Sequence, residues 1–131
     1  MGKSLIIKGA DFSSVAINPS EFYTATIGSL QDNGSITISS TYRAYILLSK
    51  AQGDIVRIKA PANSGLSFTA WNTDENHALV GDKPMNAWET EYDLELTTGY
   101  FAINVRYGEG KISDIMTQEQ LDAAPFELIT Y

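Results

Sequence analysis

The sequence predicts an all-β protein, an antiparallel β-sandwich of jelly-roll-like type with one short helix near its C-terminus. Hydrophobic residues recur at every second position in many segments, and turn-forming residues separate those segments. Helical signals occur at one place alone, so the apolar strand faces must cover one another. The 131 residues match the length of one domain, which we expect to span residues 1–131.

The clearest strands lie in the second half of the chain. Because successive side chains of a strand point to opposite faces, residues 92–97 should direct Tyr92, Leu94 and Leu96 into the core. Residues 100–107 alternate again, and their expected core set is Phe101, Ile103, Val105 and Tyr107. The outer, ligand-facing set is Tyr100, Ala102, Asn104 and Arg106.

Seven further segments have strand patterns, namely residues 4–8, 22–27, 35–39, 42–48, 54–60, 66–70 and 126–130. Residues 42–48 are apolar on both faces, as a central strand would be. Ile36 and Ile38 should point inward after a tight turn at Asp32-Asn33-Gly34. In residues 66–71, Leu66, Phe68 and Ala70 should point inward, and the outward set is Ser67, Thr69 and Trp71.

The two ends of the chain carry separate signals. Thr117 and Gln120 fit a capping box and Pro125 should end the helix, so we expect a short helix over residues 116–125. Residues 1–20 are expected to form a leader strand segment. The apolar stretch at the start is too short for a signal peptide, and no apolar run approaches the ~20 residues of a membrane helix. We therefore expect a soluble protein, from which a signal peptide could have been trimmed.

Residues 72–91 form a long connection that interrupts the strand pattern. A connection of this length is either a functional loop or contains a small hairpin near Leu79. Its oxygen-bearing residues would suit calcium, namely Asn72, Asp74, Glu75, Asn76 and Asp82. A solvated acidic loop is the favoured interpretation, because the Asp-x-Asp-x-Asp-Gly pattern of calcium loops is missing.

Composition excludes several classes of function. The chain has no cysteine, which excludes disulfides, thiol catalysis and cysteine-based metal sites. Its net charge of −7 argues against a nucleic-acid partner and against anionic membranes. His77 is the one histidine, and no Gly-x-Ser-x-Gly elbow accompanies it. We expect no enzyme, no cofactor and no metal, although a hydrolase with paired carboxylates stays as a third alternative.

Aromatic and polar residues on the outer strand face predict a ligand-binding surface. Sugar rings stack on aromatic planes, and their hydroxyls pair with amide and guanidinium groups. The candidate ligand-binding residues are Trp71, Asn72, Trp88, Tyr100, Asn104 and Arg106. Two interpretations of Trp71 stay open, since it either faces the ligand or is buried under the 72–91 connection. For Trp88 we favour exposure, and Arg106 could instead pair with Glu91 or Glu95.

Three motifs carry a resemblance to a known group of proteins. They are Phe68-Thr-Ala-Trp71-Asn72, Ala87-Trp88 and the strand pair over residues 92–106, and the opening residues 3–12 look like a leader segment. With these motifs, residues 42–112 resemble the small β-sandwich modules of gut-bacterial surface proteins and of bacteriophage tail or virion proteins. Such modules are similar to carbohydrate-binding domains. The resemblance implies glycan recognition on a virion or cell surface.

Together these features predict a non-catalytic, lectin-like module that binds carbohydrate. Trp71, Trp88 and Tyr100 would stack on the sugar, while Asn104 and Arg106 would form hydrogen bonds. One shallow site should bind weakly, so repeated copies or a homo-oligomer would supply avidity. The alternative is a structural or assembly protein of a phage or prophage particle, whose partners are other protein subunits.

Overall fold

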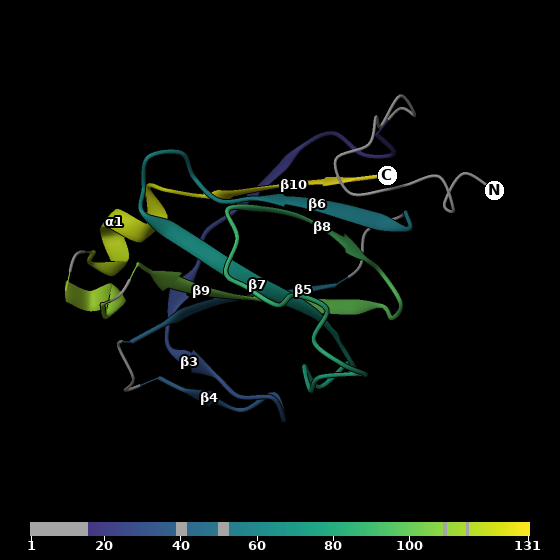
Figure 1. Ribbon diagram of the computed structural model, residues 1–131, viewed down its shortest axis with the longest axis horizontal. Helices are drawn as coiled ribbons and strands as arrows, with labels where there is room; N and C mark the ends of the chain where they lie inside the picture. Colours follow the sequence, from purple (N-terminus) through teal and green to yellow (C-terminus); the bar gives the residue numbers. More distant parts are fainter. Residues whose placement is uncertain (1–15, 39–41, 50–52, 109, 115) are drawn as a thin grey trace.

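The computed structural model describes residues 16–38, 42–49, 53–108, 110–114 and 116–131. The strands are β1 (Glu21–Tyr23), β2 (Thr26–Ile27), β3 (Ser29–Leu30), β4 (Ile36–Thr37), β5 (Ala44–Ser49), β6 (Ile55–Lys59), β7 (Leu66–Thr73), β8 (Glu91–Glu95), β9 (Tyr100–Tyr107) and β10 (Phe126–Thr130). A 3-10 turn, η2 (Ile112–Asp114), and the helix α1 (Gln118–Asp122) lie between β9 and β10. The predicted all-β class with a short helix near the C-terminus is confirmed (Figure 1).

Among the residues that the structure describes, the strands form two four-stranded sheets and one hairpin. Sheet A has the order β1-β10-β6-β8, and sheet B has the order β2-β5-β9-β7. Strands β3 and β4 pair as a separate hairpin, and neighbouring strands run antiparallel throughout. From β5 to β10 each strand lies in the opposite sheet from the strand before it. The predicted antiparallel pairing is confirmed, whereas the jelly-roll order stays a prediction.

Side chains of both sheets meet in one hydrophobic core. Sheet B contributes Ala44, Ile46, Leu48, Leu66, Phe68, Ala70, Phe101, Ile103 and Val105, and sheet A contributes Val56, Ile58, Leu94, Phe126 and Leu128. Phe68 of β7 meets Phe126 of β10 edge to face, with ring centroids 5.9 Å apart. This geometry is favourable for two aromatic quadrupoles. The inward positions predicted for β7, β8 and β9 are therefore confirmed.

Two strand predictions need correction. The segment 22–27 forms two short strands in different sheets, because the chain crosses from sheet A to sheet B at the buried Ala25. Ile38 does not point inward and is 79% exposed. The reason is that β4 ends at Thr37, so the inward alternation that begins at Ile36 does not continue.

The β3–β4 hairpin lies on the side of sheet B that faces away from sheet A (Figure 1). Its predicted turn is confirmed by a hydrogen bond from the Gly34 N–H to the Gln31 carbonyl at 2.9 Å. Gly34 has a φ of +91°, a conformation that L side chains rarely adopt. A Cβ at Gly34 would also collide with the backbone oxygen of Asn76. Glycine at this position lets the hairpin approach the connection that follows β7.

The long connection after β7 runs along the free edge of β7 itself. Backbone bridges join Thr73 to Leu79 and Phe68 to Glu89. Between these bridges, the Met85 sulfur accepts a hydrogen bond from the β7 backbone at 3.1 Å. The small hairpin expected near Leu79 is thus present, closed by its bridge to Thr73. Coverage of this kind protects an eight-residue edge strand from pairing with another chain.

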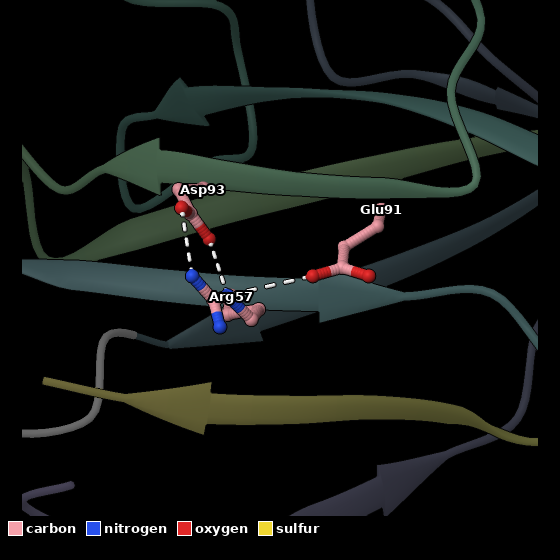
Figure 2. Close-up of polar contacts among 3 residues, drawn as sticks. All are labelled: Arg57, Glu91 and Asp93. Atoms are coloured by element: carbon pink, nitrogen blue, oxygen red, sulfur yellow. Dashed lines mark hydrogen bonds and ion pairs between the residues drawn. The ribbon is translucent and has the colours of Figure 1, made fainter. Parts of the chain in front are cut away.

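The outer face of sheet A carries an ion pair between neighbouring strands (Figure 2). Arg57 of β6 lies directly opposite Asp93 of β8, and its Nε and Nη2 donate to the two carboxylate oxygens at 2.8 and 3.2 Å. The Glu91 carboxylate approaches the same Nε to 3.6 Å. The hydrogen bond to Asp93 raises the pKa of Arg57 above its ordinary value, because it favours the charged guanidinium. The pair joins an edge strand to the interior of the sheet.

The predicted capping box is confirmed at α1. The Thr117 hydroxyl accepts from the Gln120 N–H, and the Gln120 side chain accepts from the Thr117 N–H. The helix itself is shorter than the expected 116–125, and it is not apolar or long enough to cross a membrane. The predicted strand 4–8 lies outside the described residues, and residues 16–20 of the expected leader segment form no strand.

We expect the Arg57–Asp93 pair to stabilise the fold measurably. Asp93→Asn should lower the free energy of unfolding by about 1–3 kcal/mol, because both side chains are largely buried and the hydrogen bonds are charge-assisted. Glu91→Gln is the matched control and should cost less than about 1 kcal/mol, since the Glu91 side chain is 53% exposed. Chemical denaturation of the three proteins gives both values. Equal losses in the two variants would contradict this assignment.

Candidate functional site

The outward residues predicted on β7 and β9 do share one face, the outer face of sheet B. Across β7 and β9, Ser67 lies opposite Arg106, Thr69 opposite Asn104, Trp71 opposite Ala102 and Thr73 opposite Tyr100. Across β5 and β9, Tyr45 lies opposite Asn104 and Leu47 opposite Ala102. The register therefore determines which of the predicted site residues are neighbours.

Trp71 is buried, which corrects its prediction as a ligand-binding residue. Its side chain is 1% exposed and lies in a second, small core with Leu30 of β3 and Ala102 of β9. The residues that pack against this core are Ile36, Tyr45, Leu47 and Leu79. The Lys83 ammonium lies 4.6 Å from the ring centroid of Trp71. Burial is thus the correct interpretation, although the β3–β4 hairpin contributes much of the cover.

Asn72 is also misplaced by the sequence prediction. It follows Trp71 in β7, so its side chain points to the inner side of sheet B, where it is 8% exposed. Its Nδ2 donates to the Glu95 carbonyl at 2.9 Å, and its Oδ1 accepts from the Thr97 N–H at 3.0 Å. The Asn72 amide therefore connects β7 of sheet B with the end of β8 in sheet A.

Tyr100 lies on the predicted face but far from Arg106. They lie six positions apart along β9, which is about 20 Å at roughly 3.4 Å per residue. The buried Trp71 core lies between these two ends of the face. The Tyr100 ring instead contacts His77 edge to face, with ring centroids 6.4 Å apart. Tyr100 therefore cannot share one small ligand with Arg106.

Trp88 and Arg106 do come together, and a second arginine joins them. The Arg106 Cζ lies 4.7 Å from the Trp88 ring centroid, and the Arg43 Cζ lies 5.2 Å from it. The bridge between Phe68 and Glu89 holds the backbone next to Trp88 against the edge of β7. The Trp88 side chain is partly exposed, which lies between burial and the exposure that the sequence favoured. We call Arg43, Trp88 and Arg106 the arginine–tryptophan cluster.

The two guanidinium groups of this cluster have few polar partners. Within the described part of the chain, neither Arg43 nor Arg106 forms an ion pair. Arg43 Nη1 donates to the Tyr42 carbonyl and Arg106 Nε donates to the Ser67 hydroxyl, both at a long 3.4 Å. The expectation that Arg106 could pair with Glu91 or Glu95 is wrong, since neither carboxylate forms an ion pair with it and Glu91 lies beside Arg57. Most N–H groups of the two guanidinium groups thus remain available.

Asn104 lies next to the cluster on β9, two residues before Arg106. In the register it is flanked by Thr69 on β7 and Tyr45 on β5. Its Oδ1 is buried and has no hydrogen-bond partner among the described residues. A buried, unpaired amide oxygen costs about 1–3 kcal/mol. Of the six predicted residues, the structure therefore brings together Trp88, Asn104 and Arg106.

Arg43 is the residue that sequence reasoning missed. Arg43 directly precedes β5 and lies two residues before Tyr45. Because side chains two residues apart in a strand point to the same face, Arg43 lies on the outer face. That signal was present in the sequence, but the neighbour of Arg43 depends on which strand pairs with β5. The pairing of β5 with β9 brings Arg43 to the end of the face where Arg106 lies.

The calcium interpretation of the 72–91 connection gains no support. The Asp74 Oδ1 accepts hydrogen bonds from the N–H groups of Asn76 and Ala78, at 2.8 and 3.0 Å, and so stabilises a turn. Across the residues that the structure describes, no three His, Asp or Glu side chains lie close enough together to hold a metal ion. A solvated loop with a structural Asp74 accounts for the acidic composition.

One cleft gathers carboxylates and bears on the hydrolase alternative. It has a volume of about 310 Å³, and its lining includes Asp82, Asp93 and Glu95. The Asp93 carboxylate, however, accepts two hydrogen bonds from Arg57. A carboxylate engaged in this way is poorly suited to donate a proton to a leaving group.

Comparison with protein-family models, with curated proteins and with solved structures finds no match for this chain. The resemblance to small β-sandwich modules accordingly stays a prediction. The functional argument depends on the geometry of the arginine–tryptophan cluster and its neighbours.

The two tryptophans should respond differently to substitution and to quenchers. Trp71→Phe should lower the free energy of unfolding by about 1–3 kcal/mol because it disturbs a packed core, while Trp88→Phe should cost less than about 1 kcal/mol. Because the chain has two tryptophans, each variant leaves one fluorophore. Iodide should quench the fluorescence of Trp71→Phe efficiently and that of Trp88→Phe weakly. The reverse order would mean that Trp71 is the accessible side chain.

Proposed function

We propose that this protein is a non-catalytic carbohydrate-binding module. Its ligand lies over the arginine–tryptophan cluster and the adjacent Asn104. The observation that carries the proposal is the contact of a partly exposed Trp88 with two guanidinium groups that form no ion pair with described residues. A flat apolar surface beside polar donors is the combination that sugar recognition requires.

Each part of the cluster has a role in this proposal. The accessible surface of Trp88 packs against the C–H face of a sugar ring, and the N–H groups of Arg43 and Arg106 donate to its hydroxyls. Arg106 belongs to β9 and Arg43 directly precedes β5, and these strands are the two inner strands of sheet B. Groups held by a rigid sheet lose little conformational entropy on binding. Several copies acting together would add to the affinity of this one small cluster.

A glycan array tests this proposal. The purified full chain, presented in several copies per particle, should bind a related set of glycans. Trp88→Ala should reduce those signals at least about tenfold, because the loss of one stacking surface costs about 1–3 kcal/mol. Phe22→Ala is the matched control, since Phe22 is an exposed aromatic residue on sheet A.

Signals that persist in Trp88→Ala would show that this cluster is not the sugar site. A blank array from a folded, multivalent preparation would argue against carbohydrate as the ligand. Signals lost equally in Phe22→Ala and Trp88→Ala would point to adhesion through exposed aromatic residues in general.

A second candidate function is subunit assembly in a phage or prophage particle. The observation that favours it is β1, which is an edge strand of sheet A among the described residues and where Phe22 is 63% exposed. Ile17, next to this edge, is 50% exposed. Exposed apolar side chains at an unpaired strand edge suit association with another protein chain.

Light scattering over a wide range of protein concentrations distinguishes the two functions. For assembly through β1, the mass should rise with concentration, and Phe22→Ser should keep the chain monomeric because it removes the exposed aromatic contact. A constant monomer mass in the unsubstituted protein would eliminate assembly through this edge.

A further inference from the structure

The two arginines of the cluster occupy neighbouring positions on one sheet face. Ala44 of β5 pairs with Val105 of β9, and the same antiparallel register carried one residue further sets Arg43 beside Arg106. Like charges at opposite positions on adjacent strands repel each other. The arrangement is therefore unfavourable for the folded protein unless another interaction compensates for it.

Trp88 compensates for only part of this repulsion. Its ring contacts both guanidinium groups, and such contacts contribute about 0.5–2 kcal/mol each. A cation–π contact, however, does not pair the guanidinium N–H groups. The hydrogen bonds that Arg43 and Arg106 do form are long, at 3.4 Å.

Two other basic residues form ion pairs with carboxylates. Arg57 binds Asp93 at 2.8 Å, and Lys83 binds Asp32 at 2.8 Å. Sixteen acidic residues against nine Lys and Arg residues make such partners plentiful. Lys59 and Lys111 likewise form no ion pair with a described residue, but Arg43 and Arg106 differ from them because they lie side by side on one sheet face and contact the same ring. Their N–H groups form a recognition element for a negatively charged group supplied from outside.

We infer that the ligand of this site is an acidic sugar, that is, a sugar residue carrying a carboxylate, such as a uronic acid. The inference rests on the proposed function and names its substrate class. The carboxylate would accept hydrogen bonds from Arg43 and Arg106, since the planar guanidinium fork matches carboxylate geometry. The apolar face of the same sugar would rest on Trp88. One small cluster would thus contact both the carboxylate and the apolar face of the sugar.

The overall charge restricts the ligand further. A net charge of −7 repels polyanions, so a densely charged polymer is unfavourable as a partner. Two unpaired guanidinium groups can balance one isolated negative charge without help from the rest of the surface. A glycan with a single acidic residue among neutral sugars satisfies both conditions.

The experiment compares matched glycans on the full chain. Oligosaccharides ending in glucuronic acid are measured beside the same oligosaccharides ending in glucose, and beside a form ending in a sulfated glucose. The carboxylated form should bind at least about tenfold more tightly than the neutral form, which corresponds to about 1.4 kcal/mol. Added sodium chloride should weaken binding of the carboxylated form and leave binding of the neutral form unchanged.

Two variants and a control assign the effect to the cluster. Arg43→Gln and Arg106→Gln should each remove most of the preference for the carboxylated form, because they weaken its binding more than they weaken binding of the neutral form. Arg43→Lys keeps the charge but loses the fork, so it should retain part of the preference. Lys59→Gln changes the net charge equally on β6 of sheet A and should preserve the preference. Thermal unfolding of each variant verifies that it is folded.

The outcomes separate this inference from the proposed function. Equal binding of the acidic and neutral forms, both lost in Trp88→Ala, would overturn the acidic sugar and leave carbohydrate binding intact. Binding of neither form would overturn both. If the sulfated form binds more tightly than the carboxylated form, the inferred carboxylate is wrong and the acidic group of the ligand is a sulfate ester.

Discussion

Sheets A and B share one apolar core, and forming it requires that alternate side chains of every long strand are buried. Each strand from β5 to β10 lies in the opposite sheet from its predecessor, so the chain returns to this core at every crossing. Phe68 and Phe126 meet across it. Because this set of side chains must be buried, the remaining alternate positions must lie on the two outer faces. The candidate site exists because of that requirement.

The outer face of sheet B is divided into two unlike parts. Around Trp71 the β3–β4 hairpin and the connection after β7 create a second core, which removes a large aromatic side chain from water. Around Arg106 the face keeps polar side chains and the partly exposed Trp88. The same connection thus covers Trp71 and also places Trp88 beside Arg106. Burial and ligand access are both set by the path of this one segment.

Arginine has contrasting roles on the two outer faces. On sheet A, Arg57 lies opposite Asp93 and joins β6 to the edge strand β8. On sheet B, Arg43 and Arg106 lie beside each other and contact Trp88 instead of a carboxylate. The residue type is the same, and the cross-strand neighbour decides whether its guanidinium serves stability or stays available for binding.

The sequence by itself determined the features that depend on local periodicity. The alternation along β7 and β9, the turn at Gly34 and the capping box at Thr117 are all encoded within a few residues. Only the tertiary structure decided that Trp71 is covered and that Arg43 joins the cluster. These facts depend on strand register and on where the β3–β4 hairpin and the connection after β7 pack against sheet B. Such contacts join residues distant in sequence, and local patterns do not encode them.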